Sequence, residues 1–395
     1  MSQIKSLYLV TGVSFILSAC SNTLPTTNAS SSANSVTIQA AKDLGYQCDL
    51  LGAMPDNPDN PKGIEGVSTS DIDTEEIIEV CSKAVKAYPK VDRYRFNLGR
   101  AYFYNDNGSK AYDLLAPLAK DDYVAAHISL GNLYEFGAEG IEHSYTLANK
   151  WYKRGADLGY AVAQFNYATS YYCGKGVDEN DIEAIKWYSK AAKQGYVDAQ
   201  YQLGEIYYHG HGVDVSYEQA FEWYLKAAKQ GHVESQSQLG YMYREGEGVT
   251  QSYEQSLHWY QEGAKHEDDS AQFGLGYLYD EGLGVPQSYK TAKKWYEVAA
   301  NNGNHSAMNN IGLLYEKGYG VPQSYKTAMQ WYLMSAEQGN NTAMENVAIY
   351  YSNGNAGEVS EEKAFEWRLK AAEAGNDDAM SNLGYIPAEP SEKAH

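Results

Sequence analysis

The chain lacks the motifs that mark the common catalytic classes. It contains no zincin motif, no nucleophile elbow and no phosphate-binding loop, and its repeated Gly-x-Gly-Val segments have neither the Gly-Lys-Ser/Thr ending of such a loop nor a strand pattern beside them. Ser360 and Lys363 have the spacing of a Ser-x-x-Lys motif, but the sequences Ser-Asp-Asn and Lys-Thr-Gly are absent. His209, His211 and His232 have no cysteine or acidic partner at a metal-binding spacing. We therefore expect no enzymatic activity, no cofactor and no metal site.

Basic residues are also scarce. Lys and Arg number 31 against 51 Asp and Glu, which gives a formal net charge of −20. An acidic surface repels the phosphate backbone, so nucleic acid is a poor partner. The charge favours a basic or neutral partner, namely a protein or a peptide, with a polysaccharide as a further candidate. We expect the chain itself to be a monomer.

Long apolar segments are missing as well, and the one apolar run stands near the N-terminus. Lys5 precedes a run from Leu7 to Leu17 that is too short to span a bilayer and is typical of a signal peptide. The sequence Leu-Ser-Ala-Cys that ends at Cys20 resembles a bacterial lipobox, which implies acylation of that cysteine. The alternative is an ordinary signal peptide with a chance cysteine.

This resemblance implies a location and a set of boundaries. We predict a lipoprotein signal peptide over residues 1–19 and a flexible tether, rich in Ser, Thr and Asn, over residues 20–44. Ser21, beside the acylated position, is similar to an outer-membrane sorting signal. We therefore expect an outer-membrane lipoprotein that faces the periplasm, with exposure at the cell surface as the alternative.

What the chain does have is a fixed period. Its seven tryptophans recur every 36 residues, and such a period is the signature of a helical solenoid. We expect these rings to form the structural core, where loss of one would cost about 3–5 kcal/mol. They are Trp151, Trp187, Trp223, Trp259, Trp295, Trp331 and Trp367.

Each period predicts two short antiparallel helices. A Gly-x-Gly turn separates them, and a capping residue then opens the second helix, which a glycine ends. The fourth repeat has Glu267 in place of that glycine. The predicted caps are Ser144, Asn180, Ser216, Ser252, Ser288, Ser324 and Ser360. At Ser360 the cap explains the Ser-x-x-Lys spacing without catalysis.

The repeated pattern resembles the Sel1-like repeat, a relative of the tetratricopeptide repeat. The fragment from Leu275 to Val285 and the pairs Trp187-Tyr188 and Ala191-Ala192 carry this resemblance. It implies an all-α fold, a right-handed α/α solenoid of about seven repeats with N-terminal and C-terminal capping helices. The repeats would occupy residues 124–385, followed by a disordered tail over residues 386–395.

The segment before the repeats is predicted to be a helical capping module over residues 45–123. Asp73 and Glu76 form a capping box that opens a helix. The segment resembles one that precedes Sel1-like repeats in other exported proteins, and this implies a disulfide between Cys48 and Cys81. The alternative is a pair of buried free thiols. Cys173 is left without an assigned role.

One face of the first helices carries the candidate binding surface. Its residues stand opposite the predicted core positions, differ from repeat to repeat and are rich in aromatic side chains, which are frequent anchors at interfaces. They are Phe165, Tyr172, Tyr201, Glu205, Tyr208, Tyr241, Arg244, Phe273, Tyr277 and Asp280. Two interpretations stand equally: the rings bind a partner, or they pack on the adjacent helix and extend the core.

The resemblance implies a non-catalytic protein that binds another macromolecule. The leading hypothesis is a lipid-anchored periplasmic scaffold or adaptor for envelope assembly or secretion. One alternative is an immunity lipoprotein that neutralises an antibacterial effector of the type VI kind, such as a phospholipase. A second is a surface-exposed factor that binds a host protein.

Overall fold

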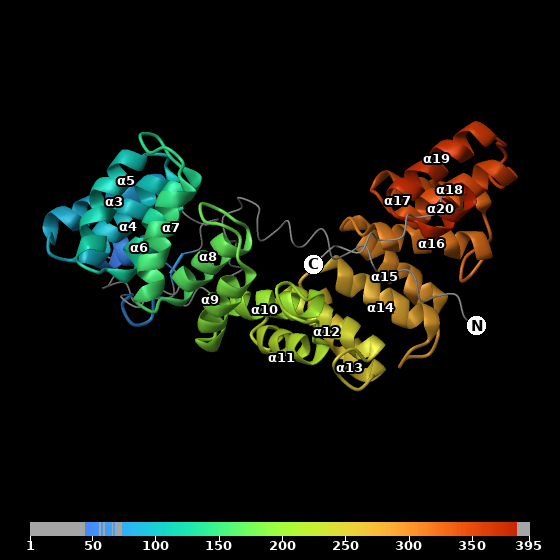
Figure 1. Ribbon diagram of the computed structural model, residues 1–395, viewed down its shortest axis with the longest axis horizontal. Coiled ribbons are helices and arrows are strands. Elements are labelled where there is room, and N and C mark those ends of the chain that lie inside the picture. The colour runs from blue at the N-terminus through green and yellow to red at the C-terminus, as the bar shows by residue number, and fades with distance from the viewer. Residues whose placement is uncertain (1–43, 55–56, 58–59, 65, 68–72, 385–395) are drawn as a thin grey trace, which may run out of the picture. The chain divides into compact units, whose positions relative to one another are not determined.

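The computed structural model of the protein describes residues 44–54, 57, 60–64, 66–67 and 73–384 (Figure 1). The predicted signal peptide, the acylation of Cys20, almost all of the tether and the C-terminal tail lie outside these residues. Nineteen helices make up the described chain, and the only β-pairing within it is an isolated bridge between Ala138 and Ile141. None of these helices is both long and apolar enough to cross a membrane. The fold is all-α, as predicted.

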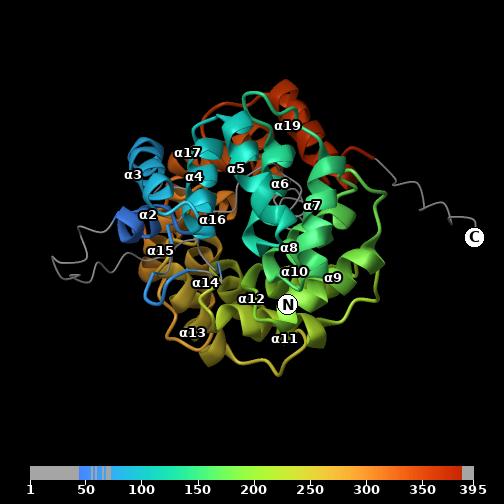
Figure 2. The ribbon, with the colours of Figure 1, turned by 90° about the vertical axis from the view of Figure 1, so that its left-hand side faces the viewer.

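The described chain divides into two compact units, and the first ends at Val215. It begins with α2 (Leu44–Gly52), α3 (Thr74–Ala87), α4 (Asp92–Tyr104) and α5 (Gly108–Lys120). The repeats follow as α6 (Val124–Phe136), α7 (Tyr145–Asp157), α8 (Ala161–Tyr172), α9 (Asp181–Lys193) and α10 (Val197–His209). In Figure 2, the first helices α6 and α8 lie on one side of this unit and the second helices α7 and α9 on the other.

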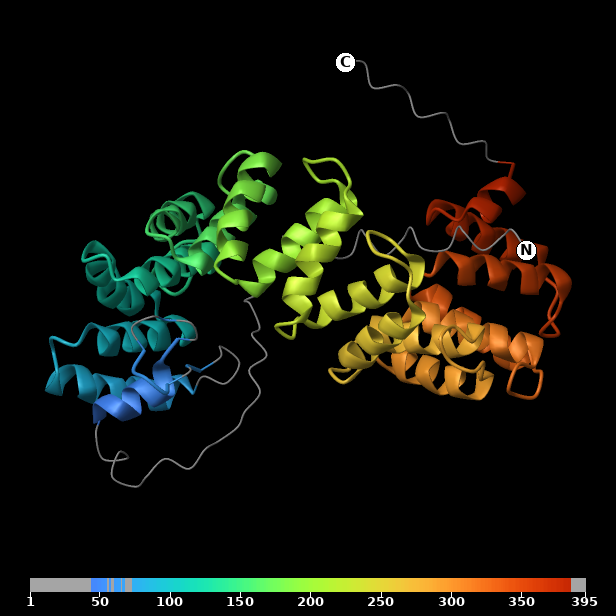
Figure 3. The same cartoon turned by 90° about the horizontal axis from the view of Figure 1, so that it is seen from below.

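The second unit begins at Ser216 and consists of repeats only. Its first helices are α12 (Val233–Glu245), α14 (Asp269–Glu281), α16 (His305–Lys317) and α18 (Asn341–Asn353). Its second helices are α11 (Tyr217–Ala228), α13 (Tyr253–Ala264), α15 (Tyr289–Asn301), α17 (Tyr325–Glu337) and α19 (Glu361–Glu373), and α20 (Asp377–Asn382) ends the unit. Each first helix packs on the second helix that follows it, and these pairs are visible in yellow to red in Figure 3.

All seven predicted caps are formed. The side chains of Ser144, Asn180, Ser216, Ser252, Ser288, Ser324 and Ser360 each accept a hydrogen bond from the backbone N–H three residues on. At Ser360 the donor is the N–H of Lys363, at 3.3 Å, while the ammonium of Lys363 donates to Glu358. Ser360 is therefore a helix cap, and its spacing to the lysine reflects the cap.

In the first six repeats the deepest ring is the tyrosine that follows the tryptophan, which corrects the sequence prediction by one position; the seventh repeat has Arg368 there. These tyrosines are almost inaccessible to solvent, and they are Tyr152, Tyr188, Tyr224, Tyr260, Tyr296 and Tyr332. All the tryptophans except Trp187 are half-buried and pack at the edge of the core. Consecutive residues on a helix point about 100° apart, so only one of two adjacent aromatic side chains can face the partner helix squarely.

In four repeats a glycine in the first helix makes room for this ring, whereas the second repeat has Ala168 at the same position. A Cβ added at Gly276 would lie 2.5 Å from the Tyr296 ring, and one at Gly312 would lie 2.6 Å from the Tyr332 ring. Carbon atoms cannot approach so closely, so the glycine and the ring fit each other. The hydroxyl of the ring can then reach a polar residue of the first helix: that of Tyr296 donates to Asp280 at 3.0 Å. The glycine of the repeated Leu-Gly sequence, such as Gly276, therefore allows the tyrosine ring to pack directly against the first helix.

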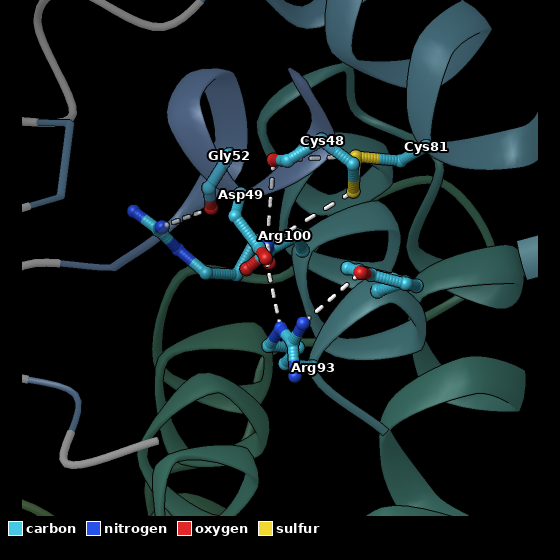
Figure 4. Close-up of a disulfide and its surroundings, with 8 residues drawn as sticks. Cys48, Asp49, Gly52, Cys81, Arg93 and Arg100 are labelled. Atoms are coloured by element: carbon cyan, nitrogen blue, oxygen red, sulfur yellow. Dashed lines mark hydrogen bonds and ion pairs between the residues drawn. A yellow bond between two sulfur atoms is a disulfide. The ribbon is translucent and has the colours of Figure 1, made fainter. Parts of the chain in front are cut away.

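The predicted disulfide is present and holds the first two helices of the capping module together. Cys48 in α2 and Cys81 in α3 are bonded and fully buried (Figure 4). Helix α4 adds two polar contacts to α2: Arg93 donates to Asp49 at 2.8 Å, and Arg100 donates to the carbonyl of Gly52 at 2.9 Å.

Exchange of the buried tyrosine should cost more stability than exchange of its tryptophan neighbour. We expect Tyr332→Leu to lower the free energy of unfolding by about 3 kcal/mol, because the ring and its hydrogen bond to Glu316 are lost from the core. Trp331→Leu should cost about 1 kcal/mol, since the indole is only partly buried. Urea unfolding followed by circular dichroism compares the two, and equal losses would contradict the assignment of the core ring.

Loss of the disulfide should destabilise the capping module. We expect the double substitution Cys48→Ala and Cys81→Ala to reduce its stability by about 3 kcal/mol, because the bridge restricts the unfolded chain across 33 residues of sequence separation. Hydrogen exchange would locate this loss in α2 to α5, with the repeats as the internal control. Labelling of both cysteines by a thiol reagent in denaturant without reductant would refute the bridge itself.

Candidate interaction surface

Four side chains at one position of the repeat form a surface ridge on the second unit. We call them the apolar row, and they are Tyr241 on α12, Tyr277 on α14, Leu313 on α16 and Ile349 on α18. The tyrosines are half-buried, and the aliphatic pair is more open, at 39% exposed for Leu313 and 36% for Ile349. Large apolar side chains that remain exposed at the same place in successive repeats indicate a docking surface.

Three residues further along each helix stands a polar row, made of Arg244, Asp280, Glu316 and Ser352. Its carboxylates are held by the core: Asp280 accepts the hydroxyl of Tyr296, and Glu316 accepts those of Tyr332 and Tyr350, all at 3.0 Å. The acids are therefore fixed in place before any partner arrives.

The two carboxylates differ in acidity because their surroundings differ. Burial raises the pKa of Asp280 to about 6, although the hydrogen bond from Tyr296 acts against this. At Glu316 burial also acts to raise the pKa, but hydrogen bonds from Lys317, Tyr332 and Tyr350 outweigh it and leave the pKa lowered. Glu316 therefore stays charged across the range in which Asp280 titrates.

Arg244 joins the two rows. Its guanidinium carbon lies 5.0 Å from the ring centroid of Tyr241 and 4.6 Å from that of Tyr277, and its Nε donates to Glu245 at 2.6 Å. Only 2% of this residue is exposed. A guanidinium between two aromatic faces is attracted to both, so it fixes the two tyrosines in orientation across α12 and α14. The prediction of Arg244 as a binding residue is therefore corrected: it supports the surface from beneath.

Four other residues that were predicted to lie on the binding surface belong to the core instead. The Phe165 ring packs 5.4 Å from that of Tyr188, and the Phe273 ring packs 5.7 Å from that of Tyr296. Tyr201 and Glu205 are buried. At these four positions the interpretation that the side chains extend the core is the right one, because the neighbouring second helix covers this edge of the first helix.

The remaining predicted residues of the first unit, Tyr172 and Tyr208, are half-buried. Tyr172 lies against the ring of His211, with centroids 6.1 Å apart, and burial raises its pKa to about 12. Tyr208 lies 5.0 Å from His209. Among the described residues, no group of His, Cys, Asp and Glu has the arrangement of a metal site.

The sequence prediction missed the most exposed members of the row. Leu313 and Ile349 stand at the same repeat position as Tyr241 and Tyr277, but they are aliphatic, and aromatic content was the criterion for selection. Alignment of the repeats by position alone would have found them. Glu345, which the prediction also left out, links α18 to its neighbours by accepting from Asn382 at 2.9 Å.

Known proteins share this arrangement. The family model described as the Sel1 repeat matches residues 124–160, 161–196, 197–232, 233–268, 269–304, 305–340 and 342–376. No protein with a curated description matches the chain.

Two solved structures are similar over most of the chain. The protective antigen c5321 of uropathogenic Escherichia coli, which displays an SLR fold, is 35% identical over 78% of this chain with a TM-score of 0.65, and the match spans 66% of that protein, just under two thirds. A Sel1 repeat protein from Oxalobacter formigenes is 30% identical, with 79% and 92% of the two chains covered and a TM-score of 0.61. With seven consecutive repeats matched and this solenoid architecture, the chain belongs to the Sel1 repeat family.

Proposed function

We propose that this protein is a non-catalytic adaptor that holds a protein partner against the first helices of its second unit. Sel1-repeat solenoids act in general as modules for protein–protein interaction. The single observation that carries the proposal is the apolar row, in which four large side chains recur at one position on α12, α14, α16 and α18. Such a row offers anchors to a chain that crosses several repeats.

The charges beside the row define the chemistry of the partner. Asp280 and Glu316 border the apolar side chains, and the whole chain carries a formal charge of −20. Complementary charge speeds association and rejects acidic competitors. The partner is therefore a protein segment with apolar side chains for the row and basic side chains for the two carboxylates.

We further propose that the adaptor acts from the periplasmic side of the outer membrane, in envelope assembly or secretion. The lipobox-like sequence that ends at Cys20 and the apolar run before it support export and acylation. The disulfide between Cys48 and Cys81 supports the same location, because structural disulfides persist in oxidising compartments. An anchored solenoid would keep its partner close to the membrane.

Charges placed in the apolar row should abolish partner binding. We expect the double variant Leu313→Glu and Ile349→Glu to recover at least tenfold less partner from native envelope than the wild type does, with little change in melting temperature because both side chains are already exposed. Quantitative mass spectrometry of cross-linked material measures the recovery.

Ile182 provides the matched control. It is 72% exposed on α9 of the first unit, so Ile182→Glu introduces the same change outside the row. This variant should recover the partner as the wild type does. Equal recovery by the row variant and the control variant would overturn the proposal.

Binding of the basic partner should weaken as the pH falls from 7 to 5. Asp280, with its pKa raised to about 6, loses its charge in this window, whereas Glu316 keeps its charge. The folded state binds the Asp280 proton more tightly than the unfolded chain does, so the same acidification stabilises the fold through this group. Titration of the purified complex should therefore show weaker binding without unfolding.

The variant Asp280→Asn separates this effect from other titrations. It should bind at pH 7 about as weakly as the wild type binds at pH 5, and it should lose most of the pH dependence. A pH dependence that the variant leaves unchanged would assign the effect to other groups and remove Asp280 from the surface.

A further inference from the structure

A cavity of about 370 Å³ opens in the first unit where α5 ends and α6 and α7 meet. It lies outside the surface described above. The residues around it include Asp122, His127, Trp151 and Arg154. Because the chain repeats itself, each of these positions can be compared with its counterparts in later repeats. Two of them, His127 and Asp122, depart from the pattern, and the Trp151 indole lines the same cavity.

The first departure is His127. Its counterparts Gln164, Gln200 and Gln236 each donate to the carbonyl eight residues back, at 3.1 to 3.3 Å, and so satisfy the end of the preceding helix. His127 makes no such bond: it is only 1% exposed, and neither ring nitrogen has a hydrogen-bond partner in the described chain. Buried polar atoms are almost always satisfied, so an imidazole left open at a cavity points to a missing ligand.

The second departure is Asp122. Its counterparts are mostly glycines, such as Gly159 and Gly195, because the backbone there has φ near +91°. Asp122 adopts φ +56°, a region that costs a non-glycine residue about 1 kcal/mol or more. Its Oδ1 accepts from Arg154 at 2.9 Å and lies 3.9 Å from the Nε2 of His127, too far for a hydrogen bond. Despite this backbone strain, the chain has an aspartate here, and its carboxylate lies beside the cavity.

The third feature is the indole of Trp151, which no cation among the described residues covers. In three of the six later repeats a lysine three residues on lies over the tryptophan: Lys190 is 3.4 Å from the ring centroid of Trp187, and the pairs Lys226–Trp223 and Lys370–Trp367 are alike at 3.7 and 4.3 Å. The other three repeats have Glu262, Val298 and Met334 at this position. At Trp151 the equivalent residue is Arg154, which turns to Asp122 instead. The Trp151 ring is left beside His127, with centroids 5.8 Å apart.

Cations surround this opening on an otherwise acidic protein. Lys153 pairs with Asp157 at 2.6 Å and Arg154 pairs with Asp122, whereas Lys120 and Lys150 form no ion pair among the described residues. Burial lowers the pKa of His127, and the nearby Asp122 acts against this, so the ring is neutral near pH 7 and offers one donor and one acceptor. The cavity thus combines two available cations, a neutral imidazole, a carboxylate and an aromatic face.

We propose that this cavity binds an acidic sugar, that is, a hydroxylated ring with a carboxylate. The C–H face of the ring would lie on Trp151, the carboxylate would meet Lys120 and Lys150, and the hydroxyls would bond His127 and Asp122. An aliphatic or aromatic acid would leave His127 and Asp122 without donors or acceptors to match, and a neutral sugar would leave the two lysines unused. The open mouth suits one residue of a longer saccharide.

The test uses the full-length protein labelled with ¹⁵N, titrated with glucuronic acid, with a galacturonic acid trimer, with glucose and with benzoate. The indole N–H signal of Trp151, assigned by its loss in Trp151→Phe, reports binding. We expect a saturable shift with both acidic sugars at affinities at least tenfold above those for glucose and benzoate. No shift up to about 20 mM glucuronic acid, where a millimolar site is nearly filled, would overturn the proposal. An equal response to benzoate would overturn the sugar class.

Two variants distinguish a binding role from a structural one. His127→Gln restores the residue of the later repeats, so its melting temperature should equal or exceed that of the wild type while its affinity for glucuronic acid falls at least tenfold. Lys150→Gln should weaken glucuronic acid several-fold, whereas Lys186→Gln, the same change at the equivalent position of the next repeat, should have no effect. Full binding by His127→Gln, or equal losses in the two lysine variants, would count against the site.

Discussion

The fold depends on one packing arrangement, a tyrosine ring pressed against a helix that has no side chain at the point of contact. In the pairs Gly276–Tyr296 and Gly312–Tyr332 the ring occupies the space that a Cβ would need. In these repeats the glycine lets the two helices approach closely, and this approach sets the position of the side chains around the ring. Small residues on the second helix, such as the buried Ala299, also allow the two helices to approach closely.

A tyrosine in such a place has a consequence that phenylalanine would not have. Its hydroxyl must find a partner when buried, and the nearest one lies on the polar side of the first helix. Asp280 and Glu316 meet that need, and in the first repeat Glu135 accepts the hydroxyl of Tyr152 at 2.6 Å. The core thereby determines where carboxylates stand beside the apolar row. The acidity of the candidate surface is thus in part a product of how the repeats hold together.

The period, the helix pairs and the caps could be predicted because each rests on local chemistry: an interval, a glycine, a side chain that accepts from its own helix. The choice between two adjacent aromatic residues could not, since it depends on how closely the partner helix approaches. The prediction of the candidate binding surface failed at some residues for the same reason. Tyr201 and Phe273 share a helix face with Tyr277, but the neighbouring helix covers that edge, and helical spacing alone does not reveal what covers it.

Repetition supplies the comparison that a single sequence otherwise lacks, although a departure from the pattern is not in itself a site. Glu267 also replaces the usual glycine, with φ +62°, yet the residue five positions on is the expected glutamine, Gln272, which accepts from Asn302 at 3.0 Å. There the glutamine position keeps its residue and a hydrogen bond. At Asp122 the same substitution comes with a His127 whose two ring nitrogens have no hydrogen-bond partner in the described chain. The combination of local strain and an unsatisfied imidazole at one cavity distinguishes this place from Glu267, because a glutamine at position 127 could donate to the preceding helix as Gln164 does.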